Sequence, residues 1–342
     1  MGLRCSDYTG QGSKSAWKNL AGHRINDMKK FNHINAKTID EAVTILRNGR
    51  AQIFAGGTDC LGILKDDVLP DYPEALINIK TIPDMDYIKE ENGVLRIGAL
   101  AKIADIARDI TVNKKYTALA DAAGRISSPQ LREMGTIGGN ICQLTRCWYF
   151  RVADNRFFCL RKGGHTCPAI NGEDRYHSIF GAVNGCVAVN VSDMAPVLIV
   201  SDAKIQTTKR VIDVEQFFSV KGHKSTVLDD DEMVTEVQIQ EPAANTRSAF
   251  VKFALRKSFD FPIVNCAATI NGSKAKICLN AVFNTPYRVT LAEESIAGKE
   301  INEVNAEAAS EAGLSEAKPL TTNKYKVQVA KVMVKRAILA CK

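Results

Sequence analysis

The segments AGGTD and TIGGN carry the most information about the fold of this chain. They occupy residues 55–59 (Ala55, Gly56, Gly57, Thr58, Asp59) and residues 136–140 (Thr136, Ile137, Gly138, Gly139, Asn140). Adjacent glycines permit positive φ, so their backbone N–H groups can point together into a concavity that binds anionic oxygens. A single glycine pair is weak evidence, because a plain turn is the more frequent explanation. Two pairs, each beside a hydroxyl residue, predict a cradle that holds the two phosphates of one pyrophosphate from opposite sides.

Two common nucleotide-binding motifs are absent from the sequence. It contains neither a G-x-G-x-x-G fingerprint nor a G-x-x-x-x-G-K-[ST] loop. A dinucleotide site of the Rossmann type and a P-loop are therefore both disfavoured.

The pattern around the glycine pairs predicts a mixed α+β chain. From Lys29 the order is βαβ-like, with a capping box at Thr38 and Glu41, and Asn92-Gly93 predicts a hairpin. Regular structure is also expected at 187–191 and 197–200. Beyond a candidate boundary at 241–245, the pattern predicts antiparallel strands at 250–255, 263–270 and 275–282, and then helices. The last helix has an apolar stripe made of Val327, Ala330, Val334, Ala337, Ile338 and Cys341.

Composition places the chain among ordinary folded proteins. Of 342 residues, 45% are hydrophobic and 24% charged, and no apolar run is long enough for a transmembrane helix. The net charge of +7 is concentrated at the two ends of the chain, so a nucleic-acid-binding face is disfavoured. Residues 1–27 are polar and basic, and they are interpreted as an extension outside the fold.

Ten cysteines indicate a metal site or a set of buried thiols. The N-terminus has no signal-peptide core, which predicts a reducing, cytoplasmic location without disulfides. Its Met-Gly-x-x-x-Ser start also fits a myristoylation pattern, which we interpret as a chance match.

Five cysteines lie in an irregular stretch at 142–186. Cys147, Cys159, Cys167 and Cys186 are separated by 11, 7 and 18 residues, without the close pairs of structural zinc sites. This spacing suits an iron–sulfur cluster, with Cys142 as a rival ligand and scattered buried thiols as the alternative.

Several further motifs follow in order and carry a family resemblance. They are Ser192-Asp193-Met194-Ala195-Pro196, the stretch from Lys252 to Pro262, and Asn284-Thr285-Pro286-Tyr287-Arg288. Together with AGGTD and TIGGN, they resemble the FAD-binding medium subunit of the molybdenum hydroxylases. This family includes xanthine dehydrogenase, carbon monoxide dehydrogenase and aldehyde oxidoreductase. The resemblance runs from about Met28 to the C-terminus.

The resemblance implies a fold and a set of FAD contacts. The expected fold is a two-subdomain FAD-binding domain of the PCMH type at 28–240, followed by a small α+β domain at 241–342. FAD contacts are expected from Ile53, Phe54 and Cys60 together with AGGTD, from TIGGN, and from Asp193 and Lys252 as polar contacts. A lysine near the pyrimidine edge of the flavin would stabilise the anionic reduced ring, and an aspartate can accept hydrogen bonds from hydroxyl groups.

The cysteine-rich insert at 142–186 resembles that of medium subunits with an extra [4Fe–4S] cluster. Such inserts occur in 4-hydroxybenzoyl-CoA reductase and in certain aldehyde oxidoreductases, and the 18-residue gap is closer to the latter. The resemblance implies Cys147, Cys159, Cys167 and Cys186 as cluster ligands. His165 and His177 are expected beside the ligands or at the surface.

The implied function is electron transfer within a multi-subunit molybdenum hydroxylase of the aldehyde, xanthine or aromatic acyl-CoA type. Hydroxylation would take place on a large molybdopterin subunit, and a small subunit would carry two [2Fe–2S] clusters, so no catalytic residue is expected in this chain. NAD or ferredoxin as the external electron partner is left open. The alternatives are a stand-alone FAD reductase with a structural cysteine loop, and a zinc-stabilised binding module.

Overall fold

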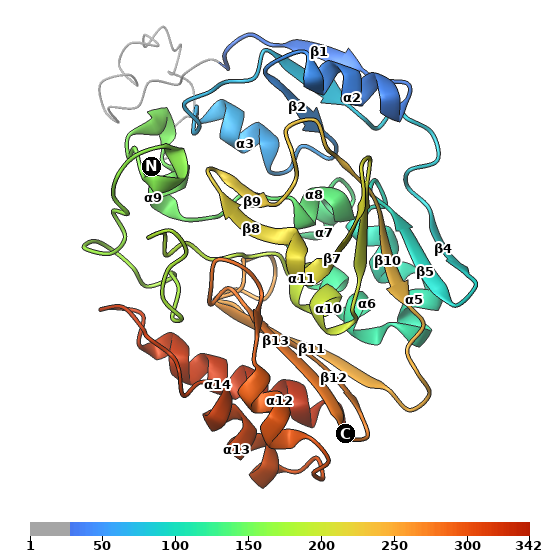
Figure 1. The fold of residues 1–342 in the computed structure, drawn as a ribbon, viewed down its shortest axis with the longest axis vertical. Coiled ribbons are helices and arrows are strands. Elements are labelled where there is room, and N and C mark those ends of the chain that lie inside the picture. The colour runs from blue at the N-terminus through green and yellow to red at the C-terminus, as the bar shows by residue number, and fades with distance from the viewer. Residues whose placement is uncertain (1–27) are drawn as a thin grey trace, which may run out of the picture.

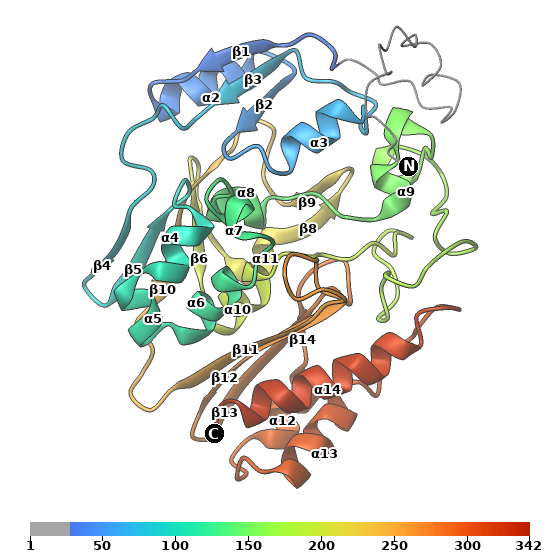
Figure 2. The same cartoon turned by 180° about the vertical axis from the view of Figure 1, so that it is seen from behind.

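The computed structural model describes residues 28–342, so the predicted extension at 1–27 lies outside the described residues. Three larger sheets follow one another along the long axis of the molecule (Figure 1). A three-stranded sheet lies at one end, a five-stranded sheet in the middle and a four-stranded sheet at the other end. Helices pack against these sheets (Figure 2). This architecture confirms the predicted α+β class.

The N-terminal sheet is parallel and places the AGGTD loop at one edge. Strands and helices alternate as β1 (Asn32–Asn35), α2 (Ile39–Arg47), β2 (Ala51–Phe54), α3 (Cys60–Lys65) and β3 (Ala75–Asn78). The strands pair in the order β1-β3-β2. Thr38 caps α2, because its hydroxyl accepts the N–H of Glu41 at 3.1 Å. The AGGTD loop follows the carboxyl end of β2, which is where open parallel sheets bind ligands.

The middle sheet is antiparallel and has the order β4-β5-β10-β6-β7. Its strands are β4 (Ile88–Glu91), β5 (Val94–Gly98), β6 (Lys204–Thr207), β7 (Val211–Asp213) and β10 (Val234–Gln240). Asn92 and Gly93 both have positive φ, 52° and 72°, and form the predicted hairpin turn between β4 and β5. The associated helices are α4 (Ile103–Arg108), α5 (Ile110–Lys115), α6 (Thr117–Gly124), α7 (Pro129–Arg132), α8 (Ile137–Ile141), α10 (Met194–Val200) and α11 (Val214–Phe217). The hairpin of β8 (Phe218–Lys221) and β9 (Lys224–Thr226) completes this part.

One expectation in this region is wrong. Residues 187–191 form no helix or strand, although residues 197–200 lie in α10 as regular structure. The segment 187–191 is extended, but its backbone bonds to loops: Val187 accepts from Ser178 N–H, and Asn190 N–H donates to Phe283. Its apolar residues Val187, Ala188 and Val191 are buried by these loops, so the pattern resembles that of a buried strand without a sheet neighbour.

The C-terminal domain pairs an antiparallel sheet with three helices. Its strands are β11 (Arg247–Phe253), β12 (Val264–Asn271), β13 (Lys274–Asn280) and β14 (Tyr287–Arg288), in that order across the sheet. The helices α12 (Thr290–Ile296), α13 (Glu303–Gly313) and α14 (Tyr325–Leu339) form a separate hydrophobic core with this sheet. Strands β11, β12 and β13 and the apolar face of the last helix were predicted from the sequence, whereas β14 was not.

The cysteine-rich insert has little regular structure, as expected for residues 142–186. It contains the single-turn helix α9 (Trp148–Arg151) and two short 3-10 turns at Ala153–Asn155 and Leu160–Lys162. It runs along one side of the molecule, from α3 towards α14 (Figures 1 and 2). A small core fastens it there, because Phe150 and Cys159 pack with Ile63 and Val68.

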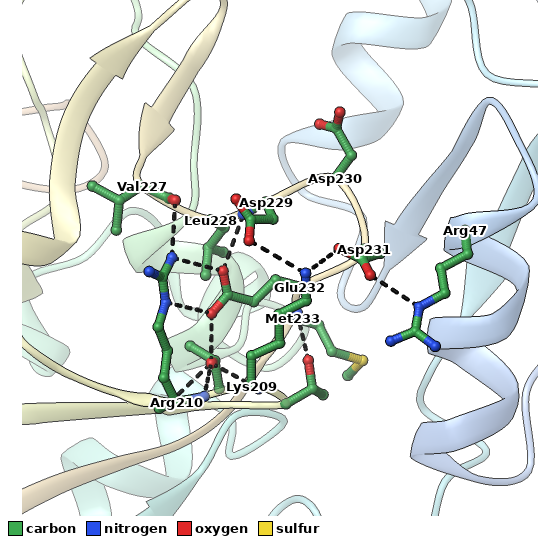
Figure 3. Close-up of polar contacts among 12 residues, drawn as sticks. Arg47, Lys209, Arg210, Val227, Leu228, Asp229, Asp230, Asp231, Glu232 and Met233 are labelled. Atoms are coloured by element: carbon green, nitrogen blue, oxygen red, sulfur yellow. Dashed lines mark hydrogen bonds and ion pairs between the residues drawn. The ribbon is translucent and has the colours of Figure 1, made fainter.

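An acidic loop before β10 connects the first two sheets (Figure 3). Asp231 accepts from Arg47 of α2 at 2.9 Å and also pairs with Lys209. Glu232 pairs with Arg210 at 3.0 Å and accepts from the Thr207 hydroxyl at 2.7 Å. This loop therefore adds ion pairs to a junction whose two sides also share one hydrophobic core. None of the described helices combines the length and the apolar character that crossing a membrane requires.

Candidate functional site

The two glycine pairs lie against each other, although about 80 residues separate them in the sequence. A Cβ atom added to Gly56 would lie 1.9 Å from the carbonyl oxygen of Met134, which directly precedes Gly135 and TIGGN. Gly57 has φ +72°, and its added Cβ would lie 2.8 Å from the Phe54 ring. Glycine is required at Gly56 because the Met134 backbone approaches too closely for a side chain, and it is favoured at Gly57 because of the positive φ.

The AGGTD loop offers unused backbone donors. Within residues 28–342, the N–H groups of Gly56, Gly57, Thr58 and Asp59 donate to no other residue. Consecutive free N–H groups beside a positive φ make a concavity that attracts anionic oxygens. The carbonyl of Ala55 is occupied, since Lys80 Nζ donates to it at 2.7 Å and lies 4.3 Å from the Phe54 ring centroid. The first loop can therefore bind a phosphate through its N–H groups.

The TIGGN segment uses its glycines for packing. Ile137 N–H donates to Ala101 O, Gly138 N–H to Ala99 O at 3.0 Å, and Gly139 N–H to the Thr136 hydroxyl at 3.1 Å. A Cβ on Gly138 would lie 2.9 Å from the Ala99 carbonyl. The expected second cradle of free N–H groups is therefore not formed. Instead, this pair lets the start of α8 pack closely beside the first loop.

Asp59 connects the glycine loop to the cysteine insert. One carboxylate oxygen lies 2.8 Å from Arg146 and 2.7 Å from Arg151, and the other accepts the N–H of Leu144 at 3.0 Å. The next residue, Cys60, begins α3, and burial raises the pKa of its thiol to about 12. Both residues were expected to contact the cofactor, and the structure places Asp59 in contact with the insert.

Asp193 and Lys252 form a buried ion pair between the middle part and the C-terminal domain. Their side chains are 5% and 8% exposed, and Lys252 Nζ lies 2.6 Å from the Asp193 carboxylate. The other carboxylate oxygen accepts from Asn265 at 2.6 Å, and Lys252 also donates to Arg125 O at 2.9 Å. Burial raises the pKa of Asp193. Asn140 of TIGGN is linked to the residue that precedes Asp193, because its side-chain oxygen accepts from the hydroxyl of Ser192 at 2.5 Å.

The four predicted ligand cysteines line one cavity. Cys147 begins α9, Cys159 precedes the second 3-10 turn, and Cys167 and Cys186 come from loops. All four border the same small space, together with Phe150, Arg161 and Ala188. Cys142, the rival ligand, ends α8 and does not line this space. The structure thus gathers the four thiols that spacing and resemblance selected.

Backbone N–H groups surround these sulfurs. Those of Tyr149 and Phe150 face Cys147 Sγ, and Ala188 N–H donates to Cys186 Sγ at 3.4 Å. A hydrogen bond from Cys186, together with nearby N–H groups, lowers the pKa of Cys167 to about 6. His177 Nε2 lies 3.2 Å from Cys147 Sγ, which places this histidine beside a predicted ligand. In residues 28–342 no three His, Cys, Asp or Glu side chains are already arranged as a metal site.

Sequence reasoning missed several residues around these features. Arg146 and Arg151, which hold Asp59, lie in an insert whose folding back onto α3 has no periodic signal. Lys80 follows a strand and reads as a solvated residue. Arg161 and Lys162 are almost fully buried, which composition alone does not predict for a basic pair. Their position two and three residues after Cys159 was the available signal.

Comparisons with known proteins agree with this geometry. A family model described as "FAD binding domain in molybdopterin dehydrogenase" matches residues 29–242. A second, described as "CO dehydrogenase flavoprotein C-terminal domain", matches residues 249–341.

Similar proteins match over nearly the full chain. The aldehyde oxidoreductase FAD-binding subunit PaoB of Escherichia coli (strain K12) is 30% identical over 315 residues, which cover 89% of this chain and 96% of PaoB. The carbon monoxide dehydrogenase medium chain of Hydrogenophaga pseudoflava is 26% identical, over 91% of this chain and 96% of that protein. A solved carbon monoxide dehydrogenase structure from the same organism superposes with a TM-score of 0.71, covering 92% of this chain and 98% of that one. The chain belongs to the FAD-binding medium-subunit family of the molybdenum hydroxylases.

Proposed function

We propose that this chain is an electron-transfer subunit that carries both FAD and a [4Fe–4S] cluster. Residues 28–240 are assigned to the FAD-binding domain with its cysteine insert, and residues 241–342 to the C-terminal domain. The partners would be a large molybdopterin subunit and a small subunit with two [2Fe–2S] clusters. The convergence of Cys147, Cys159, Cys167 and Cys186 on one cavity carries this proposal.

The AGGTD loop fits a pyrophosphate. Its N–H groups at Gly56, Gly57, Thr58 and Asp59 have no partner among the described residues, and Gly57 holds the positive φ that turns them to one side. TIGGN packs beside this loop and shapes its wall. Lys252, held by Asp193, would place a fixed positive charge at the cofactor from the C-terminal domain. A nearby positive charge favours the anionic reduced form of a flavin.

The insert fits a cubane cluster in its donor chemistry. Four thiols and several backbone N–H donors match the ligands and the N–H···S bonds of such clusters. The space that the four cysteines line measures about 10 Å³. A bound cluster would therefore need the four side chains to rotate outward, and the sparse regular structure of the insert permits this adjustment.

The two groups would supply complementary chemistry when bound. Flavin exchanges electrons singly or in pairs, whereas an iron–sulfur cluster exchanges them singly, so together they link one-electron centres on a partner to an external acceptor such as NAD or ferredoxin. The residues of this chain bind and orient these groups and set the charge around them. They include no group assigned to hydroxylation, which belongs to the large partner.

Metal analysis of matched variants tests the proposal. The wild-type chain, purified without oxygen, is expected to contain about four iron atoms and four sulfides per FAD, as a [4Fe–4S] cluster requires. Cys159→Ala should lose most of the iron and the cluster absorption, because one ligand is missing. Cys142→Ala is the matched control, since this partly buried thiol lies outside the cavity, and it should keep the full iron content.

Three outcomes would contradict the proposal. A yellow wild-type chain with FAD but no iron or sulfide would indicate a flavoprotein with a structural cysteine loop. A colourless chain containing zinc would indicate a zinc-stabilised binding module. Equal iron loss in Cys142→Ala and Cys159→Ala would remove the link between this cavity and the metal.

A further inference from the structure

Two consecutive basic residues are buried beside the cysteine cavity. Arg161 and Lys162 are 5% and 4% exposed, and both lie in the 3-10 turn that follows Cys159. Arg161 itself lines the cavity. Basic residues are almost never fully buried unless they are paired with an opposite charge. This pair therefore requires an explanation beyond packing.

Neither side chain has a carboxylate partner among residues 28–342. Arg161 donates only to neutral acceptors, namely the carbonyls of His223 and Lys224 and the hydroxyl of Ser225, at 3.2, 3.0 and 3.0 Å. Lys162 Nζ makes no hydrogen bond and lies 5.5 Å from the Phe150 ring centroid. A ring face offers weak compensation for a buried ammonium group.

The groups that can become negative and that act on this pair are the cavity thiols. Cys147, Cys159 and Cys186 act electrostatically on Arg161, and Cys147 and Cys159 act on Lys162. As neutral thiols they leave two adjacent positive charges uncompensated, which strongly disfavours the buried state. Four thiolates around a dipositive iron–sulfur core would form a doubly negative site. That charge balances the two cations.

We propose that Arg161 and Lys162 are built-in counter-cations of the cluster and raise its reduction potential. This inference rests on the proposed function. One-electron reduction by a partner's [2Fe–2S] centre, or by dithionite in the laboratory, adds one negative charge to the site. No bond is made or broken, and no proton is required. A fixed positive charge nearby stabilises the reduced form relative to the oxidised form, because the reduced form carries more negative charge.

Lys162 provides the sharper test. Arg161 also ties the insert to the β8–β9 hairpin, so its replacement removes structural hydrogen bonds as well as charge. Lys162 makes none, so Lys162→Met removes the charge and keeps the length of the side chain. Lys162→Arg keeps the charge and serves as the rescue variant. Lys204→Met, at an exposed position on β6, is the matched control for loss of a positive charge elsewhere.

The measurement is the midpoint potential of the cluster, followed by electron paramagnetic resonance in the full-length, FAD-loaded chain. At a fixed potential, the ratio of reduced to oxidised cluster in Lys162→Met should fall about tenfold, a downward shift of 59 mV for a one-electron couple. Lys162→Arg and Lys204→Met should stay within about twofold of the wild type. An unchanged potential in an iron-replete Lys162→Met overturns the inference and leaves the cluster assignment intact. A wild-type chain without iron overturns both.

If Lys162→Met does not retain its cluster, the inference is tested by comparing the unfolding temperatures of the cluster-free chains. Without an anion in the cavity, Lys162 is an uncompensated buried charge. The cluster-free Lys162→Met chain should therefore unfold at a higher temperature than the cluster-free wild type. An equal or lower unfolding temperature would overturn the inference.

Discussion

Gly56 shows how one residue can determine the packing of the AGGTD loop. The position of its missing side chain is filled by the backbone of Met134, whose carbonyl oxygen would lie 1.9 Å from a Cβ atom. Neither backbone can yield easily, because the loop follows β2 directly and Met134 follows α7 closely. We expect Gly56→Ala to destabilise the chain by about 3 kcal/mol, the upper range for overpacking, and to abolish FAD retention. Thermal unfolding and the FAD-to-protein ratio check both effects.

Gly62 provides the control for this substitution. It lies in α3, a few residues further on, and an added Cβ would meet nothing within 4 Å. Gly62→Ala should leave FAD content unchanged and stabilise the chain by about 0.4–1 kcal/mol, because alanine loses less entropy in a helix. If Gly56→Ala retained FAD as well as Gly62→Ala does, close contact between the two glycine segments would not be needed for binding.

For individual residues, the sequence predicted which ones lie close together in the fold but did not predict their side-chain contacts. The glycine pairs and the four insert cysteines are found together, because motif and spacing reflect local backbone requirements. Asp59 was expected at the cofactor, but the ion pairs of its carboxylate with Arg146 and Arg151 were not predicted. That contact depends on how an irregular insert of more than forty residues folds back. No periodicity encodes such a path.

Among the elements, α14 has an unexpected role as an anchor for the insert. Lys326 is 1% exposed, and its Nζ donates to the carbonyls of His177 at 2.9 Å and Ala281 at 2.6 Å. Asn323, one turn earlier, donates to His177 O and Ser178 O. The C-terminal domain thereby fixes the segment that places His177 beside Cys147.

Replacing Lys326 with methionine should produce a pH-dependent loss of stability. The carbonyl of Ala281 would lose its donor, at a cost of about 1–3 kcal/mol for a buried unpaired group. Burial lowers the pKa of Lys326 from 10.5 to about 7 in the folded chain. Between these values the unfolded chain binds a proton that the folded chain lacks, so the stability of the wild type rises with pH relative to Lys326→Met. Below about pH 7 this difference should become flat.

Unfolding in denaturant at a series of pH values measures this effect. His177, which contacts Lys326, does not interfere above pH 7, because burial lowers its pKa to about 4. Lys324→Met, at an exposed position just before α14, should show neither the loss nor the pH trend. A wild-type minus Lys326→Met difference that fell as pH rose would contradict the assigned protonation behaviour.

The sequence predicted the existence of most elements and missed this role of α14. Its apolar stripe was recognised, since Ala330, Val334, Ala337 and Ile338 recur at helical spacing and are buried. Lys326 lies just before this stripe and reads as a solvent-facing lysine. Its burial depends on two carbonyls from distant parts of the chain, that of His177 in the insert and that of Ala281 directly after β13. The prediction of regular structure at residues 187–191 was wrong for a similar reason, because the backbone partners of this segment lie in loops.

For the whole molecule, the junction between the first two sheets combines a shared hydrophobic core with a few exposed ion pairs. Arg47 of α2 pairs with Asp231, and their side chains are 60% and 25% exposed (Figure 3). Exposed ion pairs contribute little and are screened by salt. Arg47→Met should therefore lower the unfolding temperature far less than Gly56→Ala does, and the small difference should disappear in about 1 M salt. A large, salt-independent loss would show that the junction depends on Arg47 for packing.

The anchoring of the insert by α14 also constrains the order in which the protein can mature. Lys326 and His177 are 149 residues apart in the sequence. During synthesis the segment bearing the four thiols leaves the ribosome long before the helix that clamps it, because chains fold from the N-terminus as they emerge. If the insert holds a cluster as proposed, iron delivery to the four thiols would be easiest while translation continues. Packing of the last helix would then enclose the loaded insert in the finished subunit.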